Sequence, residues 1–141
     1  MPFPALEFRR TLKSRLEELP LLADELEAWA LQQGMALKLI NSLNLLLDEV
    51  ISNIVKYGYE NQPDGSIELL VHRLGPNIEA IVRDYAPPFN LLENAAPDVA
   101  ESLETRPVGG LGIYLIRQLA DEISYRRDGE ANEVTLRKAA I

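Results

Sequence analysis

The hydrophobic positions of the chain recur at two different spacings, and each spacing predicts a different kind of element. Over residues 36–57, aliphatic side chains return every three or four positions and Gly58 ends the run, which predicts a long amphipathic helix. The same spacing predicts a helix over 15–33, where Pro20 should delay or bend the first turn. The side chains expected to face the core from these helices are Leu16, Leu19, Leu22, Leu26, Trp29, Ala30, Leu43, Leu47, Val50 and Ile54.

Alternating apolar and polar positions predict strands elsewhere in the chain. A third helix is expected to open at the glycine cluster of residues 109–112. The order of elements predicts an α+β two-layer sandwich, in which the helices cover one face of a mostly antiparallel mixed sheet. His72 falls on the polar side of its strand with no carboxylate evident beside it, so we expect a half-exposed residue without a catalytic role. The expected strands cover residues 5–12, 66–73, 78–83, 123–127 and 132–138.

The segment between the strand expected over residues 78–83 and the third helix follows neither the helical nor the strand spacing. Residues 85–107 include Pro87, Pro88, Pro97 and Pro107 and several acidic side chains. Long segments without regular structure inside a compact domain are often active-site lids. We therefore expect a lid over about 85–110, within a single domain that takes in residues 1–141.

Composition narrows the classes of function. The hydrophobic share is 47%, the charged share is 26%, and the formal net charge is −8. This negative charge weighs against nucleic acid and anionic membranes as partners, because both require a basic surface. The lack of cysteine excludes a thiolate zinc site, and the single histidine argues against a histidine metal cluster. Since the sequence also lacks a membrane-length apolar run and a secretory signal pattern, we expect a cytoplasmic protein.

Three separate segments carry residues suited to binding a phosphorylated ligand. Glu49 and Asn53 lie one turn apart on an otherwise apolar helix, where unpaired polar groups are costly. Asp84 ends a predicted strand just before an Ala-Pro-Pro-Phe sequence. The glycines of residues 109–112 precede a helix, whose free N–H groups favour anions. Each feature also has a purely structural explanation, because Asp84 can cap a turn and the glycines can permit a tight bend.

Taken together and in this order, the three segments resemble the nucleotide-binding boxes of the histidine-kinase-like ATPase (GHKL) superfamily. This superfamily has the Bergerat-type ATP-binding fold and also includes type II topoisomerases and mismatch-repair proteins. Within it, the chain is most similar to the anti-sigma-factor serine-protein kinases. The chain departs from the usual family pattern at Ala86, where glycine is common, and at Tyr57, where histidine is frequent. The resemblance rests on residues 49–59, 83–90, 107–117 and 128–138.

The resemblance implies a site for ATP and Mg²⁺. In this interpretation Asp84 accepts a hydrogen bond from the adenine amino group, and Asn53 offers its carbonyl oxygen to the metal. Glu49 is the implied catalytic residue, which orients the substrate hydroxyl and takes its proton. Tyr57 is expected to pack at the end of its helix. The implied nucleotide-binding residues are Asn53, Asp84, Phe89, Gly109, Gly110, Leu111 and Gly112.

The resemblance further implies an ATP-dependent serine-protein kinase that phosphorylates a small anti-sigma-factor antagonist protein. Its other implied partners are a sigma factor or another regulator, between which the domain switches, and a second copy of itself in a homodimer. The main alternative is a non-catalytic ATP-binding module that sequesters a regulator. Autonomous ATP hydrolysis is less favoured, because no additional transducer domain is evident, and the strand location of His72 disfavours a histidine kinase.

Overall fold

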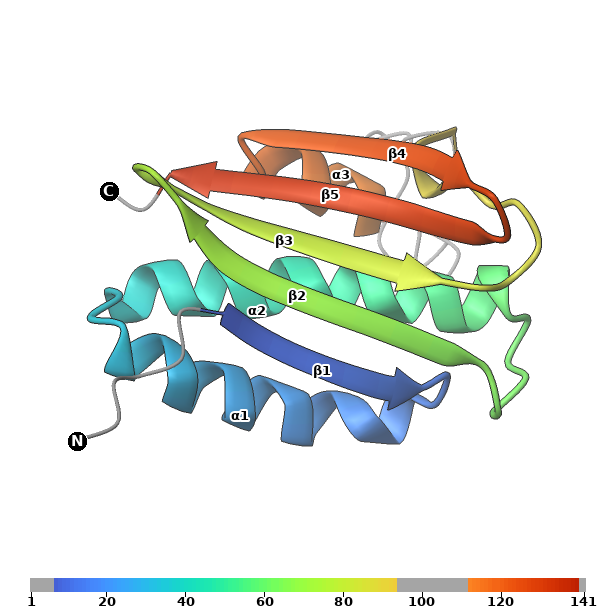
Figure 1. Cartoon of the computed structure of the whole chain (residues 1–141), viewed down its shortest axis with the longest axis horizontal. Helices are drawn as coiled ribbons and strands as arrows, with labels where there is room; N and C mark the ends of the chain where they lie inside the picture. Colours follow the sequence, from blue (N-terminus) through green and yellow to red (C-terminus); the bar gives the residue numbers. More distant parts are fainter. Residues whose placement is uncertain (1–6, 94–111, 140–141) are drawn as a thin grey trace, which may run out of the picture.

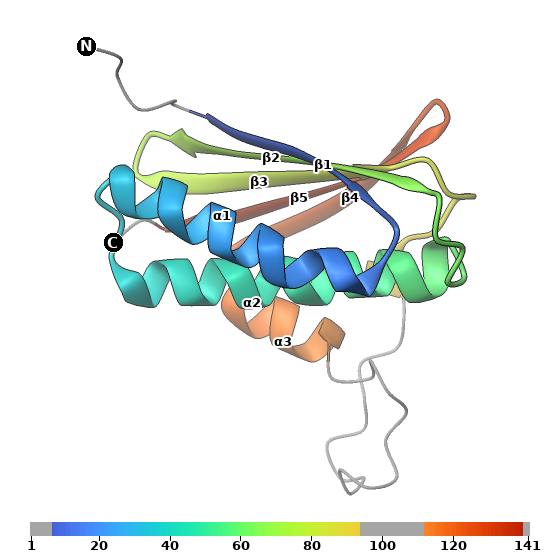
Figure 2. The same cartoon turned by 90° about the horizontal axis from the view of Figure 1, so that it is seen from below.

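The structure is a computed structural model that describes residues 7–93 and 112–139. One layer is a five-stranded sheet in the order β1-β2-β3-β5-β4, and the other layer is three helices on one face of that sheet (Figures 1 and 2). Each neighbouring pair of strands is antiparallel, so the predicted two-layer sandwich is confirmed. The elements are β1 (Glu7–Lys13), α1 (Leu19–Gln32), α2 (Leu37–Asn53), β2 (Ser66–Leu74), β3 (Asn77–Asp84), α3 (Gly112–Leu119), β4 (Glu122–Asp128) and β5 (Ala131–Ala139).

The start of α1 follows from Pro20, which occupies the first turn of the helix. Proline is tolerated there because the first N–H groups of a helix have no partner within the helix. The preceding residues Leu16–Glu18 form a short 3-10 turn. The expectation that Leu16 faces the core is wrong: its side chain is 38% exposed, because the 3-10 turn takes it out of the helical register.

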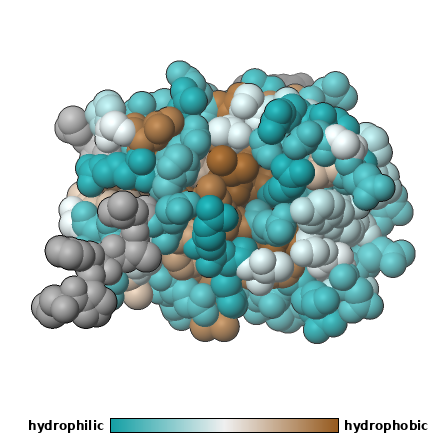
Figure 3. Space-filling model, viewed as in Figure 1, coloured by the Kyte–Doolittle hydropathy of each residue, from teal (hydrophilic) through white to brown (hydrophobic). Residues whose placement is uncertain are grey.

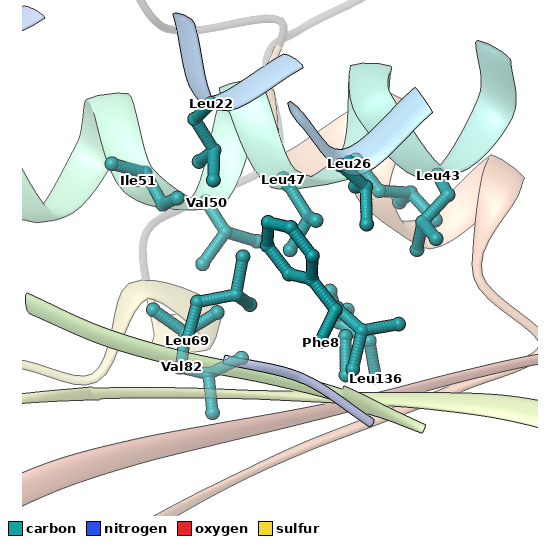
Figure 4. Close-up of a cluster of buried hydrophobic side chains, with 14 of the residues drawn as sticks. Phe8, Leu22, Leu26, Leu43, Leu47, Val50, Ile51, Leu69, Val82 and Leu136 are labelled. Atoms are coloured by element: carbon teal, nitrogen blue, oxygen red, sulfur yellow. The ribbon is translucent and has the colours of Figure 1, made fainter. Parts of the chain in front are cut away.

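The core lies between the sheet and the paired helices α1 and α2. Figure 4 shows side chains of α2 meeting those of β1, β2, β3 and β5 in one cluster. The Phe8 ring of β1 also lies 5.9 Å from the Trp29 ring of α1, measured between centroids. Leu43, Leu47 and Val50 are buried as expected, which fixes the orientation of α2 about its axis.

The arrangement of layers gathers three chain segments at one end of the molecule. The C-terminal end of α2, the end of β3 and the turn between β4 and β5 all lie at the right of Figure 1. Beyond Asn53, α2 continues as a wider π-helical turn, Ile54–Gly58. Single π turns occur frequently at functional sites. Most of the predicted lid, residues 94–110, lies outside the described residues, and so do Gly109, Gly110 and Leu111.

Among the described residues, no helix covers the other face of the sheet (Figure 2). Figure 3 shows this face as mainly hydrophilic, with hydrophobic atoms gathered at its centre. His72 and Glu79 are cross-strand neighbours here, and Nε2 of His72 lies 2.9 Å from Oε1 of Glu79. The expectation that His72 has no carboxylate beside it is therefore wrong, because the β2–β3 hairpin brings one opposite it. Within the described ranges, none of the helices is long and apolar enough to cross a membrane.

Candidate nucleotide-binding site

The last turn of α2 presents Glu49 and Asn53 on one side, as their spacing predicts. Asn53 is only 2% exposed, and its Nδ2 donates to the backbone carbonyl of Glu49 at 2.6 Å. A carbonyl only accepts, so this bond fixes the orientation of the amide and turns its Oδ1 away from the helix backbone. That oxygen is buried and has no hydrogen-bond partner among the described residues. Because an unpartnered buried oxygen is costly, the site suits a ligand that this oxygen can bind.

Gly112 brings the glycine-rich segment to the same two side chains. A Cβ at this position would lie 2.6 Å from Oε2 of Glu49 and 3.0 Å from Nδ2 of Asn53. A methyl group here would require the Glu49 carboxylate to turn away and the Asn53 amide to shift, so glycine lets α3 start this close to α2 with both side chains in place. The contact joins two of the three segments that the sequence singled out.

Asp84 is held at the end of β3 by neutral donors. The residue is 2% exposed, and its Oδ1 accepts from Nδ2 of Asn132 at 2.8 Å and from the backbone N–H of Ala86 at 3.0 Å. Asn132 lies directly opposite Asp84 in the β3–β5 register. Both of these bonds go to the same carboxylate oxygen, so the orientation of the carboxyl group is fixed from the side of the sheet.

The loop after Asp84 is tied to β5 and to the end of α2. Asn132 donates to the carbonyls of Ala86 and Pro87, at 3.2 and 3.1 Å, and accepts from the N–H of Phe89 at 3.1 Å. On its other side the loop meets Gly58, where an added Cβ would lie 3.6 Å from both Ala86 Cβ and Phe89 Cδ2. These contacts connect the Asp84 segment with the helix that carries Glu49 and Asn53.

Tyr57 occupies the exposed border of this junction. Its ring lies 6.4 Å from that of Phe89, measured between centroids, and its side chain is 42% exposed. The packing that we expected of Tyr57 is therefore made against Phe89, one of the residues implied in nucleotide binding.

The two carboxyl groups of the site share an electrostatic feature. Burial raises the pKa of Glu49 above its ordinary value, repulsion from Asp48 adds to the rise, and attraction to Lys56 opposes it. Burial also raises the pKa of Asp84, while the bonds from Asn132 and Ala86 and the charge of Arg127 act in the other direction. Both carboxylates are thus less stabilised in the folded protein than they would be in water.

The residues present fit a magnesium ion that arrives with its own anionic ligands. Oδ1 of Asn53 is a neutral oxygen donor with no other partner in the described structure. Mg²⁺ prefers oxygen ligands and usually keeps several waters or phosphate oxygens. Residues 7–93 and 112–139 contain no group of three His, Cys, Asp or Glu side chains that could form a metal cage by themselves. The amide oxygen therefore matches a metal bound mainly through polyphosphate.

Asn132 is a site residue that the sequence reasoning did not single out. The side chain is 1% exposed and contacts Asp84 and the loop that follows it. A signal was available, because Asn132 shares the alternation of Val134 and Leu136 and therefore points toward the core. A polar residue at an inward position of a strand requires partners, and here the partners belong to the candidate site.

Comparison with known proteins agrees with this geometry. Residues 12–138 match the family described as histidine kinase-like ATPase domain. The match covers most of the chain, which therefore belongs to that family.

The relatives narrow the class further. The chain is 30% identical over 103 residues to "Serine-protein kinase RsbW" of Listeria innocua, which covers 70% of this chain and 66% of the relative. It is 27% identical to "Serine/threonine-protein kinase BtrW" of Bordetella bronchiseptica, over 79% of this chain and 78% of the relative. A structure of the RsbU and RsbW domains of Rv1364c from Mycobacterium tuberculosis matches with a TM-score of 0.69 and 17% identity, over 96% of this chain and 32% of that one. The chain spans slightly less than two thirds of the length of the Listeria relative, and the Listeria and Bordetella relatives are both named as serine- or serine/threonine-protein kinases.

Proposed function

We propose that this chain is an ATP-dependent serine-protein kinase of the anti-sigma-factor type. The observation that carries the proposal is the buried Oδ1 of Asn53, which has no partner among the described residues and lies beside the Glu49 carboxylate, where Gly112 brings the start of α3 close to both side chains. Its substrate would be a serine hydroxyl of a small anti-sigma-factor antagonist protein. The names of the relatives support kinase chemistry, and the closeness of Glu49, Asn53 and Gly112 supports a site for it.

The proposed nucleotide contacts use all three segments. Asp84, whose Oδ1 is occupied by protein donors, would accept the adenine amino group at its other oxygen. Phe89 would border the base. Oδ1 of Asn53 would bind Mg²⁺, which supplies charge neutralisation at the transferring phosphoryl group. The phosphates would be held by backbone N–H groups of the segment leading into α3, namely those of Gly109, Gly110, Leu111 and Gly112.

Glu49 is the proposed catalytic residue. The raised pKa of its carboxyl group makes its carboxylate a stronger base than an exposed glutamate. It would orient the serine hydroxyl toward the phosphoryl group and take up the proton. Phosphoryl transfer has a loose transition state, so we expect orientation by Glu49 to matter more than the proton transfer itself.

The proposed regulation is partner switching. The domain would bind either the antagonist or a sigma factor or other regulator, working in the cytoplasm and as a homodimer. The alternative is a module that binds ATP and sequesters a regulator without phosphorylating anything. The half-buried Glu49 carboxylate beside Gly112 and Asn53 favours catalysis over this alternative, since a module would have no need of that carboxylate.

The kinase proposal is tested by incubating the protein with labelled ATP, Mg²⁺ and candidate antagonist domains. Glu49→Ala should retain ATP binding and lose at least about 100-fold in label transfer. Asp24→Ala is the control, because Asp24 is an exposed acidic residue on α1 and takes no part in the site. Equal transfer by Glu49→Ala and the control would remove Glu49 from the mechanism. Nucleotide binding without transfer to any antagonist would favour the sequestering module.

A further inference from the structure

Arg127, near the end of β4, reaches into the loop that follows Asp84. Its Nη1 donates to the carbonyl of Ala86 at 2.8 Å, and its Nε donates to the carbonyl of Gly129 at 3.0 Å. The bond to Gly129 anchors the guanidinium to the β4–β5 turn, and the bond to Ala86 holds the loop that follows Asp84. An arginine side chain can serve both carbonyls because its N–H donors have fixed directions in one plane.

Ala86 is held at both its backbone N–H and its backbone carbonyl. Its N–H donates to Oδ1 of Asp84, and its carbonyl accepts from both Arg127 and Asn132. The charge of Arg127 also stabilises the ionised form of Asp84, as the direction of its effect on the Asp84 pKa indicates. The β4–β5 hairpin therefore fixes the loop by a neutral amide on β5 and a cation on β4.

The neighbouring Arg126 has a different environment. It points to the open face of the sheet, where its Nε donates to Glu133 at 2.9 Å, and its side chain is 66% exposed. The two arginines are adjacent in sequence and carry the same charge, but only Arg127 contacts the Ala86 loop. This pair provides a comparison in which charge is held constant and position is varied.

We propose that Arg127 is a positioning residue for adenine recognition, which holds the Ala86 loop so that the Asp84 carboxylate faces the base. The proposal rests on the nucleotide-binding function proposed above. Arg127 acts through Asp84 and Ala86, and it makes no contact with nucleotide itself. Loss of its bond to Ala86 should leave the Ala86 carbonyl held by Asn132 alone, so adenine should be bound less tightly and less selectively.

The test measures MgADP and MgGDP binding by calorimetry for the full chain and three variants. We expect Arg127→Ala to raise the dissociation constant for MgADP by about 3- to 10-fold, the size of one ordinary net hydrogen bond, because the effect reaches the nucleotide only through the loop, with a smaller change for MgGDP. Arg127→Lys, which keeps a cationic donor, should recover part of the loss. Arg126→Ala should bind like the unaltered chain. Equal binding by Arg127→Ala and Arg126→Ala, or an equal loss for both nucleotides, would overturn the proposal.

A second measurement separates this proposal from the function on which it rests. Hydrogen exchange without nucleotide should be faster at the amides of Ala86 and Phe89 in Arg127→Ala than in Arg126→Ala, and unchanged exchange would also overturn the role of Arg127. Failure of the unaltered chain to bind MgADP would instead contradict the proposed function. If Arg127→Ala does not fold, Arg127→Met replaces it, because methionine keeps an unbranched apolar stem and has no N–H donor in its side chain.

Discussion

Two acidic side chains of β3, Glu79 and Asp84, are buried on opposite faces of the sheet in opposite surroundings. Glu79 lies on the open face and bonds Nε2 of His72 and Nε of Arg137, each at 2.9 Å. Burial acts to raise the pKa of Glu79, but the bonds and charges of His72 and Arg137 outweigh it, so the pKa is lowered. Asp84 lies on the helix face, is hydrogen-bonded by an amide and a backbone N–H, and has a raised pKa.

The difference separates structural polar groups from groups that suit a ligand. Glu79 has protein partners for its charge and contributes to the stability of the sheet. Asp84 and Asn53 are buried among the core residues, but the carboxyl group of Asp84 is destabilised as an anion and the amide oxygen of Asn53 has no partner in the described structure. Buried polar groups that the protein itself does not fully stabilise are expected at sites that bind a ligand.

Among the substitutions that distinguish the Glu79 cluster from the Asp84–Asn53 site, Asn53→Ala should have the largest effect on ATP binding. We expect magnesium-dependent ATP binding to fall by at least about 100-fold, because the variant lacks the proposed metal ligand. Stability should not fall, since alanine favours helices and the removed oxygen has no partner. Calorimetry with and without Mg²⁺ measures the binding. Asn44→Ala is the matched control on the same helix, and unchanged ATP affinity in Asn53→Ala would refute the metal assignment.

Asp84→Asn should be next in size. Its amide can still accept from Asn132 and Ala86 through one oxygen, but it would present an N–H donor where the adenine amino group needs an acceptor. We therefore expect ATP affinity to fall about 10- to 100-fold, the effect of a mismatched buried hydrogen bond. Stability at neutral pH should be equal or higher, because an unfavourably buried charge has been removed. A loss of stability with unchanged ATP binding would make Asp84 a structural residue like Glu79.

Glu79→Gln should show the opposite pattern. Its loss of charge weakens the bonds to His72 and Arg137. The expected cost is about 1 kcal/mol of unfolding free energy, at the low end for charged hydrogen bonds because the cluster borders solvent. ATP affinity should stay within about two-fold of the unaltered chain. Urea unfolding and calorimetry on the same preparation provide both values, and reduced ATP affinity here would contradict the separation of the two regions.

The pH dependence of these stability differences should be the smallest effect. Glu79 has a folded pKa below its usual 4.5, so its contribution is present above pH 4.5 and is lost as the pH falls through the lower folded value. Asp84 has a folded pKa above its usual 3.8, so it reduces stability as the pH rises through that higher value. The unaltered chain should therefore lose its stability advantage over Glu79→Gln on acidification. Asp84→Asn should likewise lose its stability advantage over the unaltered chain, because Asp84 is then protonated and uncharged. Urea unfolding between about pH 2 and about pH 7 measures both, and a stability difference for either variant that does not change with pH would contradict the corresponding shift.

Most of the fold could be predicted because hydrophobic spacing determines it. The buried stripe of α2, the alternation of β2 and the proline at the start of α1 each have a local cause, and the structure has the elements that they predict. Leu16 was wrongly placed because a helical stripe was extended across a segment that forms a 3-10 turn. Spacing along the chain does not reveal where a helix changes its period.

The candidate site could be predicted only in part, because its partners come from strand pairing. Glu49, Asn53 and Gly112 are brought together as the combined motifs predict. The bonds of Asn132 to Asp84 and of Arg127 to Ala86 depend on the register of β5 against β3 and on the position of the β4–β5 turn. Glu79 was likewise not predicted as a neighbour of His72, because strand pairing was not considered. The register of the short β2–β3 hairpin would have placed the two residues opposite each other.

The central claim is that buried polar groups from separate segments form a site for magnesium-bound ATP. Its most direct test is a calorimetric titration of the unaltered chain with ATP and with GTP, each with Mg²⁺ and with EDTA. The account predicts saturable binding of ATP that weakens without Mg²⁺, and at least about 10-fold weaker binding of GTP. No binding of ATP, or equal binding of the two nucleotides with no effect of Mg²⁺, would contradict it.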